Sequence, residues 1–411
     1  MNGKNILNNM EHMCPLPWVG FSNDPYGSVK PCCINKDYIV KPDGSFFYVQ
    51  NDTVGDIFHS EYMDNLRTQF LNGEKPKGCE TCWKDEDNGY KSKRQIYIEI
   101  LKNNGTTVDY GKVPEYPEDY QIILNNSCNL KCRSCSPSHS TSWLKEVNDI
   151  PESEWEKFGI RYFGLKHGQP GHQTSEFIES MDTWLPHVRR LEIVGGEPFY
   201  SNTWERVLTH MINEGHSKKI LLNMSTNGTI LNEDLMIKIC EGFKAVGIGL
   251  SIDGTEGTFE YLRKNAVWDE VKKNLFKYHE LRKKYKNLGF TYTHTTSWVN
   301  AYELPKTIQW MRDNTPLFDF WLNIVHYPPH MSIYMLPKEE KDRIKSHWET
   351  FDFKEQTNDI KALIEFMYSK QPSEDELRRE YTKFTILDGY RNESTIDIVK
   401  TNYPTLVNYF M

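Results

Sequence analysis

The chain has 411 residues, of which 26% are charged, 38% hydrophobic and 13% aromatic. This size and composition exclude a disordered chain and a small disulfide-stapled protein, and predict about two or three domains with buried cores. A net charge of −8 argues against nucleic acid or an anionic membrane as a partner. Because no apolar run reaches the roughly 18 residues of a membrane helix and the N-terminus shows no secretory pattern, we expect a cytoplasmic protein.

The first part of the chain, residues 1–112, is rich in turn-forming residues and predicts a small irregular domain. Within it, residues 46–49 predict a strand, and apolar spacing predicts helices over 60–70 and 91–102. Two prolines in residues 113–119 predict a linker to the next domain.

From residue 120 onward, short apolar strands alternate with helical segments, which is typical of βα units with a parallel sheet. The predicted strands are 121–124, 190–194, 220–225, 245–251, 290–296 and 318–325. The predicted helices between them are 203–213, 233–243, 269–285 and 303–312. This α/β pattern predicts an incomplete barrel of six βα units over 113–335, with its chemistry at the carboxyl ends of the strands. Residues 159–171 predict a lid or substrate loop, and residues 336–411 a helical C-terminal extension.

Nine cysteines fall into two clusters and one outlier. They are Cys14, Cys32, Cys33, Cys79, Cys82, Cys128, Cys132, Cys135 and Cys240. An odd number of cysteines in a reducing compartment argues against disulfides, so we expect metal ligation. Cys240 lies on the apolar face of a predicted helix, and we interpret it as a buried, inert thiol rather than a hydrogen-atom donor.

The central cluster, Cys128-Asn-Leu-Lys-Cys132-Arg-Ser-Cys135, stands directly after the first predicted strand of the barrel. Three thiolates so close together hold three corners of a cubane iron–sulfur cluster and leave one iron open for a ligand. The alternative is a structural zinc ion with His139 as its fourth ligand.

This C-x3-C-x2-C motif after the first strand of a βα repeat resembles the radical S-adenosylmethionine (SAM) superfamily. The resemblance implies a partial (β/α)6 TIM-like barrel whose open iron chelates SAM. It further implies reductive cleavage of SAM to methionine and a 5′-deoxyadenosyl radical, which abstracts a hydrogen atom from a substrate. No catalytic protein residue is predicted.

Motifs at the ends of the later strands extend the resemblance. Gly195-Gly196-Glu197-Pro is similar to the family motif that binds the methionyl amino group, for which a carboxylate is a suitable acceptor. The segments Ser225-Thr-Asn227-Gly and Ser251-Ile-Asp253-Gly resemble further family signatures that contact the ribose or methionyl group, with Asp253 facing cofactor or substrate. In isolation, each Asn-Gly or Asp-Gly pair is better interpreted as a simple turn.

Arg263 resembles the family's arginine that pairs with the methionyl carboxylate. The alternative is that Arg263 is a solvated surface arginine. Asn300 and His326 follow the fifth and sixth strands, where the family places further cofactor and adenine contacts. The predicted SAM-binding set is therefore Gly195, Gly196, Glu197, Ser225, Asn227, Ser251, Asp253, Arg263, Asn300 and His326.

The early cysteines resemble the auxiliary-cluster domains of the same superfamily, in the shorter form called the twitch domain. The pattern is Cys14, then Gly-x4-Cys32-Cys33, then Cys79-x2-Cys82, and here it precedes the barrel. The resemblance to radical enzymes with an N-terminal twitch domain includes residues 54–57, 64–67, 261–268 and 387–391. The predicted ligands of this auxiliary 4Fe-4S cluster are Cys14, Cys32, Cys79 and Cys82.

The glycine spacing favours Cys32 over its neighbour Cys33. A structural zinc ion on four cysteines is the alternative at this site, with radical chemistry retained in the barrel.

The expected function is that of a radical SAM enzyme, in which the auxiliary cluster assists a net oxidation of a small molecule or a peptide. The expected electron donor is a flavodoxin or ferredoxin, by family analogy. Because the first motif cysteine is Cys14, we expect no leader-peptide-binding domain before it. The alternative from another class is a non-catalytic iron–sulfur electron carrier.

Overall fold

The structure is a computed structural model that describes residues 12–87, 91–103, 107–155 and 180–411. The predicted loop 159–171 lies outside the described residues. The chain divides into two compact units, which are described separately. Unit 1 comprises Met1–Asn126, Gly164–Met224 and Leu235–Val246, and unit 2 comprises Ser127–Phe163, Ser225–Asp234 and Gly247–Met411.

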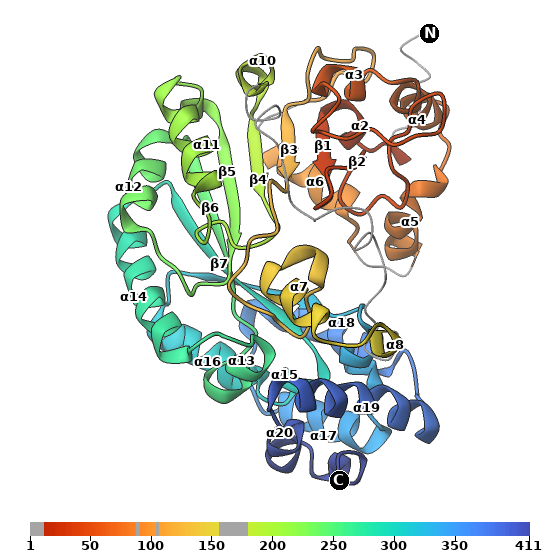
Figure 1. The fold of residues 1–411 in the computed structure, drawn as a ribbon, viewed down its shortest axis with the longest axis vertical. Helices are drawn as coiled ribbons and strands as arrows, with labels where there is room; N and C mark the ends of the chain where they lie inside the picture. Colours follow the sequence, from red (N-terminus) through yellow and green to blue (C-terminus); the bar gives the residue numbers. More distant parts are fainter. Residues whose placement is uncertain (1–11, 88–90, 104–106, 156–179) are drawn as a thin grey trace. The chain divides into compact units, whose positions relative to one another are not determined.

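Unit 1 is built on strands in the order β2-β1-β3-β4-β5 (Figure 1). Their bounds are β1 Gly20–Asn23, β2 Val29–Lys30, β3 Asp119–Ile122, β4 Arg190–Ile193 and β5 Leu221–Thr226, which enters unit 2 at Ser225. Strand β1 pairs with β2 in antiparallel and with β3 in parallel orientation, and β3, β4 and β5 pair in parallel. The sequence pattern does not predict β1, because this strand has only four residues, Gly-Phe-Ser-Asn, and none of them is β-branched.

The helices of unit 1 are α2 Leu16–Val19, α3 Val54–Phe58, α4 Glu61–Leu71, α5 Glu80–Asp87, α6 Lys93–Asn103, α10 Met181–Trp184, α11 Asn202–Asn213 and α12 Glu233–Gly242, the last of which starts at the unit boundary. The helices α4, α6, α11 and α12 begin near the positions predicted from apolar spacing, whereas the short helices α2, α3, α5 and α10 were not predicted. Cys240 is buried on α12, as predicted. The predicted strand over 46–49 is wrong, because only single bridges, Ser28 to Tyr48 and Val40 to Phe46, form around the tight turn at Gly44.

Unit 2 holds the strands β6 Ala245–Ser251, β7 Leu288–Thr296 and β8 Asp319–Ile324 in that order, with β7 and β8 parallel. The helices alternating with them are α13 Glu256–Leu262, α14 Trp268–Lys284, α15 Trp298–Ala301 and α16 Leu304–Asn314. The helices α7 Thr141–Asn148 and α8 Glu152–Trp155 follow the central cysteines. Parallel strands that alternate with helices confirm the predicted α/β class with a partial TIM-like barrel.

The predicted helical C-terminal extension is confirmed. It consists of α17 Lys338–Trp348, α18 Thr357–Tyr368, α19 Glu374–Arg391 and α20 Thr395–Asn402. These helices share one apolar core with α15, in which Trp298, Trp348, Tyr381 and Tyr403 are at most 1% exposed. The extension is therefore an integral part of unit 2.

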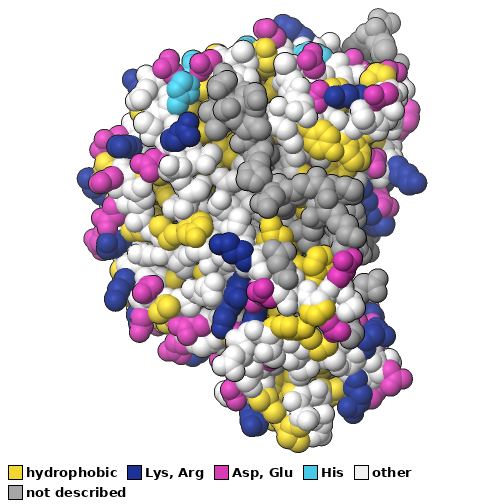
Figure 2. Space-filling model, viewed as in Figure 1, with side chains coloured by type: hydrophobic (Ala, Val, Ile, Leu, Met, Phe, Trp, Pro, Cys, Tyr) yellow, Lys and Arg dark blue, Asp and Glu magenta, His cyan; other side chains and the backbone are white. Residues whose placement is uncertain are grey.

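The surface carries positive and negative side chains interspersed on the face shown in Figure 2. Among the described helices, none is both long and apolar enough to cross a membrane. The predicted domain boundaries at 112/113 and 335/336 stay a prediction.

Candidate metal and cofactor sites

The loop before α7 carries the three central cysteines of unit 2. Cys128 and Cys132 are buried and Cys135 is half-buried. Burial raises the pKa of the Cys135 thiol to about 12, and negative charge on Cys132 and Cys128 adds to this rise. The three thiols are therefore close enough to influence one another, as ligands of one cluster must be.

Hydroxyl groups at the N-terminus of α7 fix the first part of this loop. The backbone N–H of Cys128 donates to Thr141 Oγ1 at 3.1 Å, and Ser142 Oγ donates to the carbonyl of Cys128 at 2.7 Å. Ser140 caps α7 and also donates to the carbonyl of Leu130. The start of a helix is thus bonded back to the loop that carries the thiols.

A buried ion pair of unit 2 lies beside Cys132. Arg263 Nη2 is 2.7 Å from Asp253 Oδ2, and Arg263 Nη1 donates to Cys132 Sγ at 3.8 Å. The backbone N–H of Thr295 holds the second carboxylate oxygen of Asp253 at 2.9 Å. Burial raises the pKa of Cys132, and the positive charge of Arg263 opposes that rise. Arg263 is buried, so the solvated surface arginine considered from the sequence is wrong.

His294 on β7 is a further buried group near this ion pair. Its side chain is 0% exposed, and its Nε2 has no hydrogen-bond partner among the described residues. Burial lowers the pKa of His294 to about 4, with Asp253 opposing and Arg263 adding to that effect. The imidazole is therefore neutral at physiological pH. The sequence analysis did not single it out, because a lone histidine in a strand carries no motif.

Asn227 connects the end of β5 to the cysteine loop. Its Nδ2 donates to Asn129 Oδ1 at 3.0 Å, and its Oδ1 accepts from the backbone N–H of Thr229 at 2.9 Å. Of the two predicted serines, Ser225 is exposed and Ser251 is half-buried. Contacts of these three side chains with SAM stay a prediction, whereas the structure shows Asn227 positioning the loop.

Asn300 has a structural role at the start of α15. Its Nδ2 donates to the carbonyl oxygens of Asp253 at 2.8 Å and Thr295 at 3.0 Å, and its Oδ1 accepts from the backbone N–H of Ser297. Asn300 thereby ties the segment after β6 to the end of β7. His326, after β8, is exposed with its ring 4.8 Å from that of Phe366. Direct cofactor contacts of both residues stay predictions.

The Gly195-Gly196-Glu197 segment follows β4 in unit 1 and forms a tight turn. Both glycines have positive φ, 82° and 59°, and a side chain on Gly195 would come within 2.6 Å of Ile123. The geometry therefore requires glycine. Glu197 is 1% exposed, and its carboxylate accepts from the backbone N–H of Phe199 at 3.2 Å. Binding of a methionyl amino group by Glu197 stays a prediction.

Four N-terminal cysteines of unit 1 line one small cavity. The apolar side chains of Leu16, Ile34, Phe70 and Trp83 complete much of its wall, and the four thiols belong to Cys14, Cys32, Cys79 and Cys82. Asn35 Nδ2 donates to Cys79 Sγ at 3.4 Å. Among the described residues, Cys33 does not line this cavity but lies in a neighbouring one, with Gln121 and Glu192.

The thiols of this cavity interact electrostatically. Burial raises the pKa of Cys32 and of Cys79 to about 12, and the Cys32 charge raises the pKa of Cys14 and Cys79 further. Ligation of a metal therefore has to displace these protons. Within the described ranges, no three His, Cys, Asp or Glu side chains converge on a position for a single metal ion.

The two sites coincide with matches to known protein families. Residues 122–296 match the radical SAM superfamily, and residues 14–83 match the iron–sulfur cluster-binding domain called SPASM. The chain therefore carries a radical SAM domain preceded by a SPASM domain, as the sequence predicts. These domains imply a 4Fe-4S cluster that binds SAM and an auxiliary cluster. The donor sets fit both groups, with three thiols on the central loop and four around the N-terminal cavity.

Individual relatives match only part of the chain. GTP 3′,8-cyclase of Paenarthrobacter nicotinovorans is 26% identical over 37% of this chain and 37% of its own length. GTP 3′,8-cyclase of Corynebacterium glutamicum is 22% identical over 43% of this chain and 41% of its own length. The chain thus spans about two fifths of the length of these relatives.

Solved structures give similarly partial matches. Native anSMEcpe with bound AdoMet is 20% identical, with a TM-score of 0.38 over 56% of this chain and 58% of that chain. SuiB of Streptococcus suis bound to S-adenosylmethionine is 12% identical, with a TM-score of 0.35 over 72% of this chain and 59% of that chain.

Proposed function

We propose that this protein is an enzyme that cleaves SAM reductively at a cluster held by Cys128, Cys132 and Cys135, and abstracts a hydrogen atom from a small molecule or a peptide. An auxiliary 4Fe-4S cluster on Cys14, Cys32, Cys79 and Cys82 assists a net oxidation of that substrate. The electron donor is a small redox protein such as a flavodoxin or ferredoxin. Radical SAM chemistry in general follows from the domain composition, and the oxidation and the substrate class are the proposal.

The observation that carries the proposal is the set of three thiols beside the Asp253–Arg263 pair. Three cysteine ligands leave one iron of a cubane without a protein ligand. When bound, such a cluster supplies the electron that cleaves SAM to methionine and a 5′-deoxyadenosyl radical. The guanidinium and carboxylate nearby have the charges needed to bind the carboxylate and ammonium groups of an amino acid.

The protein's own residues hold this chemistry in place. Arg263 donates to Cys132 Sγ and so favours the thiolate that ligation requires. Asn227 bonds to Asn129 of the cysteine loop, and Asn300 fixes the backbone at Asp253. The strand ends of unit 2 are thereby bonded to each other and to the loop, which limits motion of the groups around the cofactor.

The N-terminal cavity supports the oxidative part of the proposal. Its four thiols complete the protein ligand set of a cubane, so the bound cluster needs no external ligand and supplies a one-electron acceptor. Loss of one hydrogen atom and then one electron and one proton from the substrate is a two-electron oxidation. The apolar side chains among the lining residues, which include Phe70 and Trp83, would limit the access of water to a bound cluster and so affect its reduction potential.

The test measures release of 5′-deoxyadenosine from SAM by anaerobically reconstituted, dithionite-reduced protein. We expect slow release by the unaltered chain, and a loss of about 100-fold or more in Cys132→Ala because the cluster loses one of three ligands. Cys240→Ala is the matched control, since this buried thiol belongs to neither site, and it should release product at the unaltered rate. Unaltered protein that is reduced but releases no 5′-deoxyadenosine would instead be an electron carrier.

A further inference from the structure

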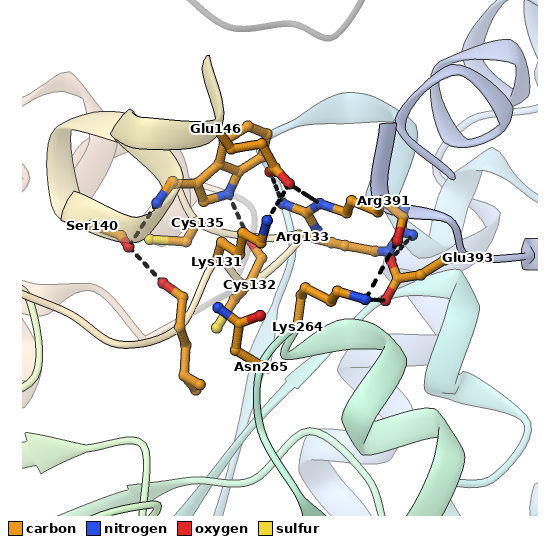
Figure 3. Close-up of polar contacts among 12 residues, drawn as sticks. Lys131, Cys132, Arg133, Cys135, Ser140, Glu146, Lys264, Asn265, Arg391 and Glu393 are labelled. Atoms are coloured by element: carbon orange, nitrogen blue, oxygen red, sulfur yellow. Dashed lines mark hydrogen bonds and ion pairs between the residues drawn. The ribbon is translucent and has the colours of Figure 1, made fainter. Parts of the chain in front are cut away.

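The end of α19, in the C-terminal extension, reaches the central cysteine loop within unit 2. Asn392 adopts a left-handed conformation, φ 49° and ψ 49°, which ends α19. The backbone N–H of Glu393 then donates to the carbonyl of Asp388 at 3.0 Å, so the chain turns back on itself. Figure 3 shows Arg391 beside Glu146, and Glu393 between Arg133 and Lys264. We call Asp388, Arg391 and Glu393 the C-terminal clamp.

The first contact of the C-terminal clamp is with Arg133, which lies inside the cysteine motif. The Arg133 side chain is 1% exposed, and its Nη2 binds Asp388 and, at 2.6 Å, Glu393 Oε2. Its guanidinium lies 3.8 Å from the centre of the Tyr261 ring. Since the backbone N–H of Arg133 donates to the carbonyl of Leu262 at 2.8 Å, both the backbone and the side chain of this residue are fixed.

The second contact reaches Cys132 through a tryptophan. The Arg391 side chain is 0% exposed and lies 2.7 Å from Glu146 Oε2. Its guanidinium lies 4.7 Å from the centre of the Trp143 ring, and the Trp143 indole N–H donates to the carbonyl of Cys132 at 2.8 Å. Lys131 Nζ is 2.6 Å from the same Glu146 carboxylate. The C-terminal clamp therefore holds the loop from both sides of Cys132.

Burying these charged side chains costs desolvation free energy, which offsets much of the stabilisation that their ion pairs provide. The Nη1 atoms of Arg133 and Arg391 are buried and have no hydrogen-bond partner among the described residues. Apolar side chains of similar size commonly stabilise a core as well as a buried ion pair does, but they do not fix direction as hydrogen-bonded charges do. The arrangement is therefore suited to setting the position of the loop more than to adding stability.

We propose that the C-terminal clamp is a positioning device that holds the cysteine loop in the conformation that binds the radical-generating cluster. The role of this loop in cluster binding rests on the function proposed above. Asp388, Arg391 and Glu393 are positioning residues, since each pairs with an ion of the loop or of α7. Asp388 also accepts from the backbone N–H of Thr395 at 2.6 Å, which joins the clamp to α20. Residues more than 240 positions away in the sequence thus control the geometry of the cysteine motif.

The test variant is Glu393→Gln, which removes one charge from a side chain that is 13% exposed and keeps its size. The control is Arg378→Gln on α19, the helix that precedes Glu393, since Arg378 is 56% exposed and pairs with exposed Glu374. A double variant, Glu146→Leu with Arg391→Met, removes both members of the second ion pair, and it leaves only the Lys131 ammonium without its partner, on a side chain that is 22% exposed to water. It therefore keeps the test valid if the single change unfolds the chain.

The first readout is backbone hydrogen exchange in the metal-free full chain. The amides of Lys131 and Arg133 donate to the carbonyls of Lys264 and Leu262, and we expect them to exchange about tenfold faster or more in the clamp variants. Residues 14–83 should exchange at the unaltered rate, and the control should match the unaltered chain throughout. Unchanged exchange over 128–135 would overturn the proposal. An equal acceleration over all of unit 2 would also overturn it, because the C-terminal clamp would then contribute only to the general stability of the unit.

The second readout is iron content and the electron paramagnetic resonance (EPR) spectrum after reconstitution. The clamp variants should lose iron and signal from the central cluster alone. A clamp variant with unaltered exchange, iron and spectrum refutes the positioning role while leaving SAM cleavage intact. Undiminished SAM cleavage by Cys132→Ala refutes the proposed function instead, so the two failures are distinguishable.

Discussion

The two cysteine sites of this chain differ in what surrounds their sulfurs. The N-terminal thiols share a cavity whose other lining residues are apolar Leu16, Ile34, Phe70 and Trp83 and polar Asn35, Thr81, Lys93 and Arg94. The central thiols lie on a loop whose neighbours are ions, including Arg263 at Cys132 and the C-terminal clamp at Arg133. Four thiols around one cavity complete a ligand set by themselves, whereas three thiols beside a buried ion pair leave a position for a polar ligand. The difference supports an electron acceptor at the first site and a cofactor-binding cluster at the second.

The largest expected effect comes from removing one ligand of the N-terminal site. We expect Cys82→Ser to lose about four of about eight irons per chain and to abolish substrate oxidation, while SAM cleavage survives. Cys33→Ser is the matched control, because Cys33 does not line the cavity in the described part of the chain, and it should keep all the iron. Iron analysis checks this, and about four irons with one zinc in the unaltered chain would assign the N-terminal site a structural role.

The next effect concerns the ion pair that distinguishes the central site. Arg263→Gln leaves the Asp253 carboxylate buried without its cation, which costs about 3–5 kcal/mol when one partner of such a pair is removed. We expect both a lower unfolding temperature and a higher KM for SAM. The double variant Asp253→Asn with Arg263→Gln removes both charges. It should recover most of the stability that Arg263→Gln loses, whereas the KM for SAM should stay high. Recovery of both quantities would mean that the pair is structural only.

We expect the stability of unit 2 to fall at low pH because of its buried histidines. Burial lowers the pKa of His294 to about 4 and that of His330 to about 3, below the ordinary value of 6.5. The unfolded chain therefore binds more protons below pH 6.5, and stability falls as the pH drops towards 4, by up to about 1.4 kcal/mol per pH unit for each histidine. Denaturant titration of the metal-free chain between pH 7 and 5 measures this slope. His294→Gln should reduce the slope, and an unchanged slope would contradict the assignment.

The smallest expected effect is a difference between two helix N-caps. Ser140 caps α7 at the cysteine loop, and Ser373 caps α19 away from the loop. Each serine-to-alanine change should cost about 1 kcal/mol of stability, as loss of an N-cap does. Only Ser140→Ala should alter the EPR spectrum of the central cluster, because Ser140 also donates to Leu130 of the loop. Equal spectra in the two variants would show that the cap acts on the helix alone.

Much of this comparison is predictable from the sequence, because motif spacing and apolar periodicity are local signals. The C-x3-C-x2-C motif, the six predicted barrel strands and the C-terminal helices lie where the spacing predicts. For the adjacent pair Cys32 and Cys33, the glycine spacing favours Cys32, and the structure places Cys32 in the cavity. The short strand β1 was missed because its pairing with β3 is a long-range interaction between segments about 100 residues apart.

The contacts of the C-terminal clamp could not be predicted from the sequence either, because they too join segments far apart in the chain. Residues 387–391 resemble a family segment, yet nothing local in them indicates that Arg391 meets Glu146 and Trp143. Likewise, Asn300 follows a strand as a cofactor contact does, but its amide is bonded to the protein's own backbone at Asp253 and Thr295. Burial and partners of polar side chains are set by tertiary packing, which a single sequence does not display.

The EPR spectrum of the reduced, reconstituted chain with and without SAM tests the central claim most directly. The account predicts two cluster signals, of which SAM changes only the one that Cys132→Ala removes, while the signal that Cys82→Ser removes stays constant. A change in both signals, in neither, or in the signal that depends on Cys82 would contradict the assignment of an open cluster to the central loop and a closed one to the N-terminal cavity.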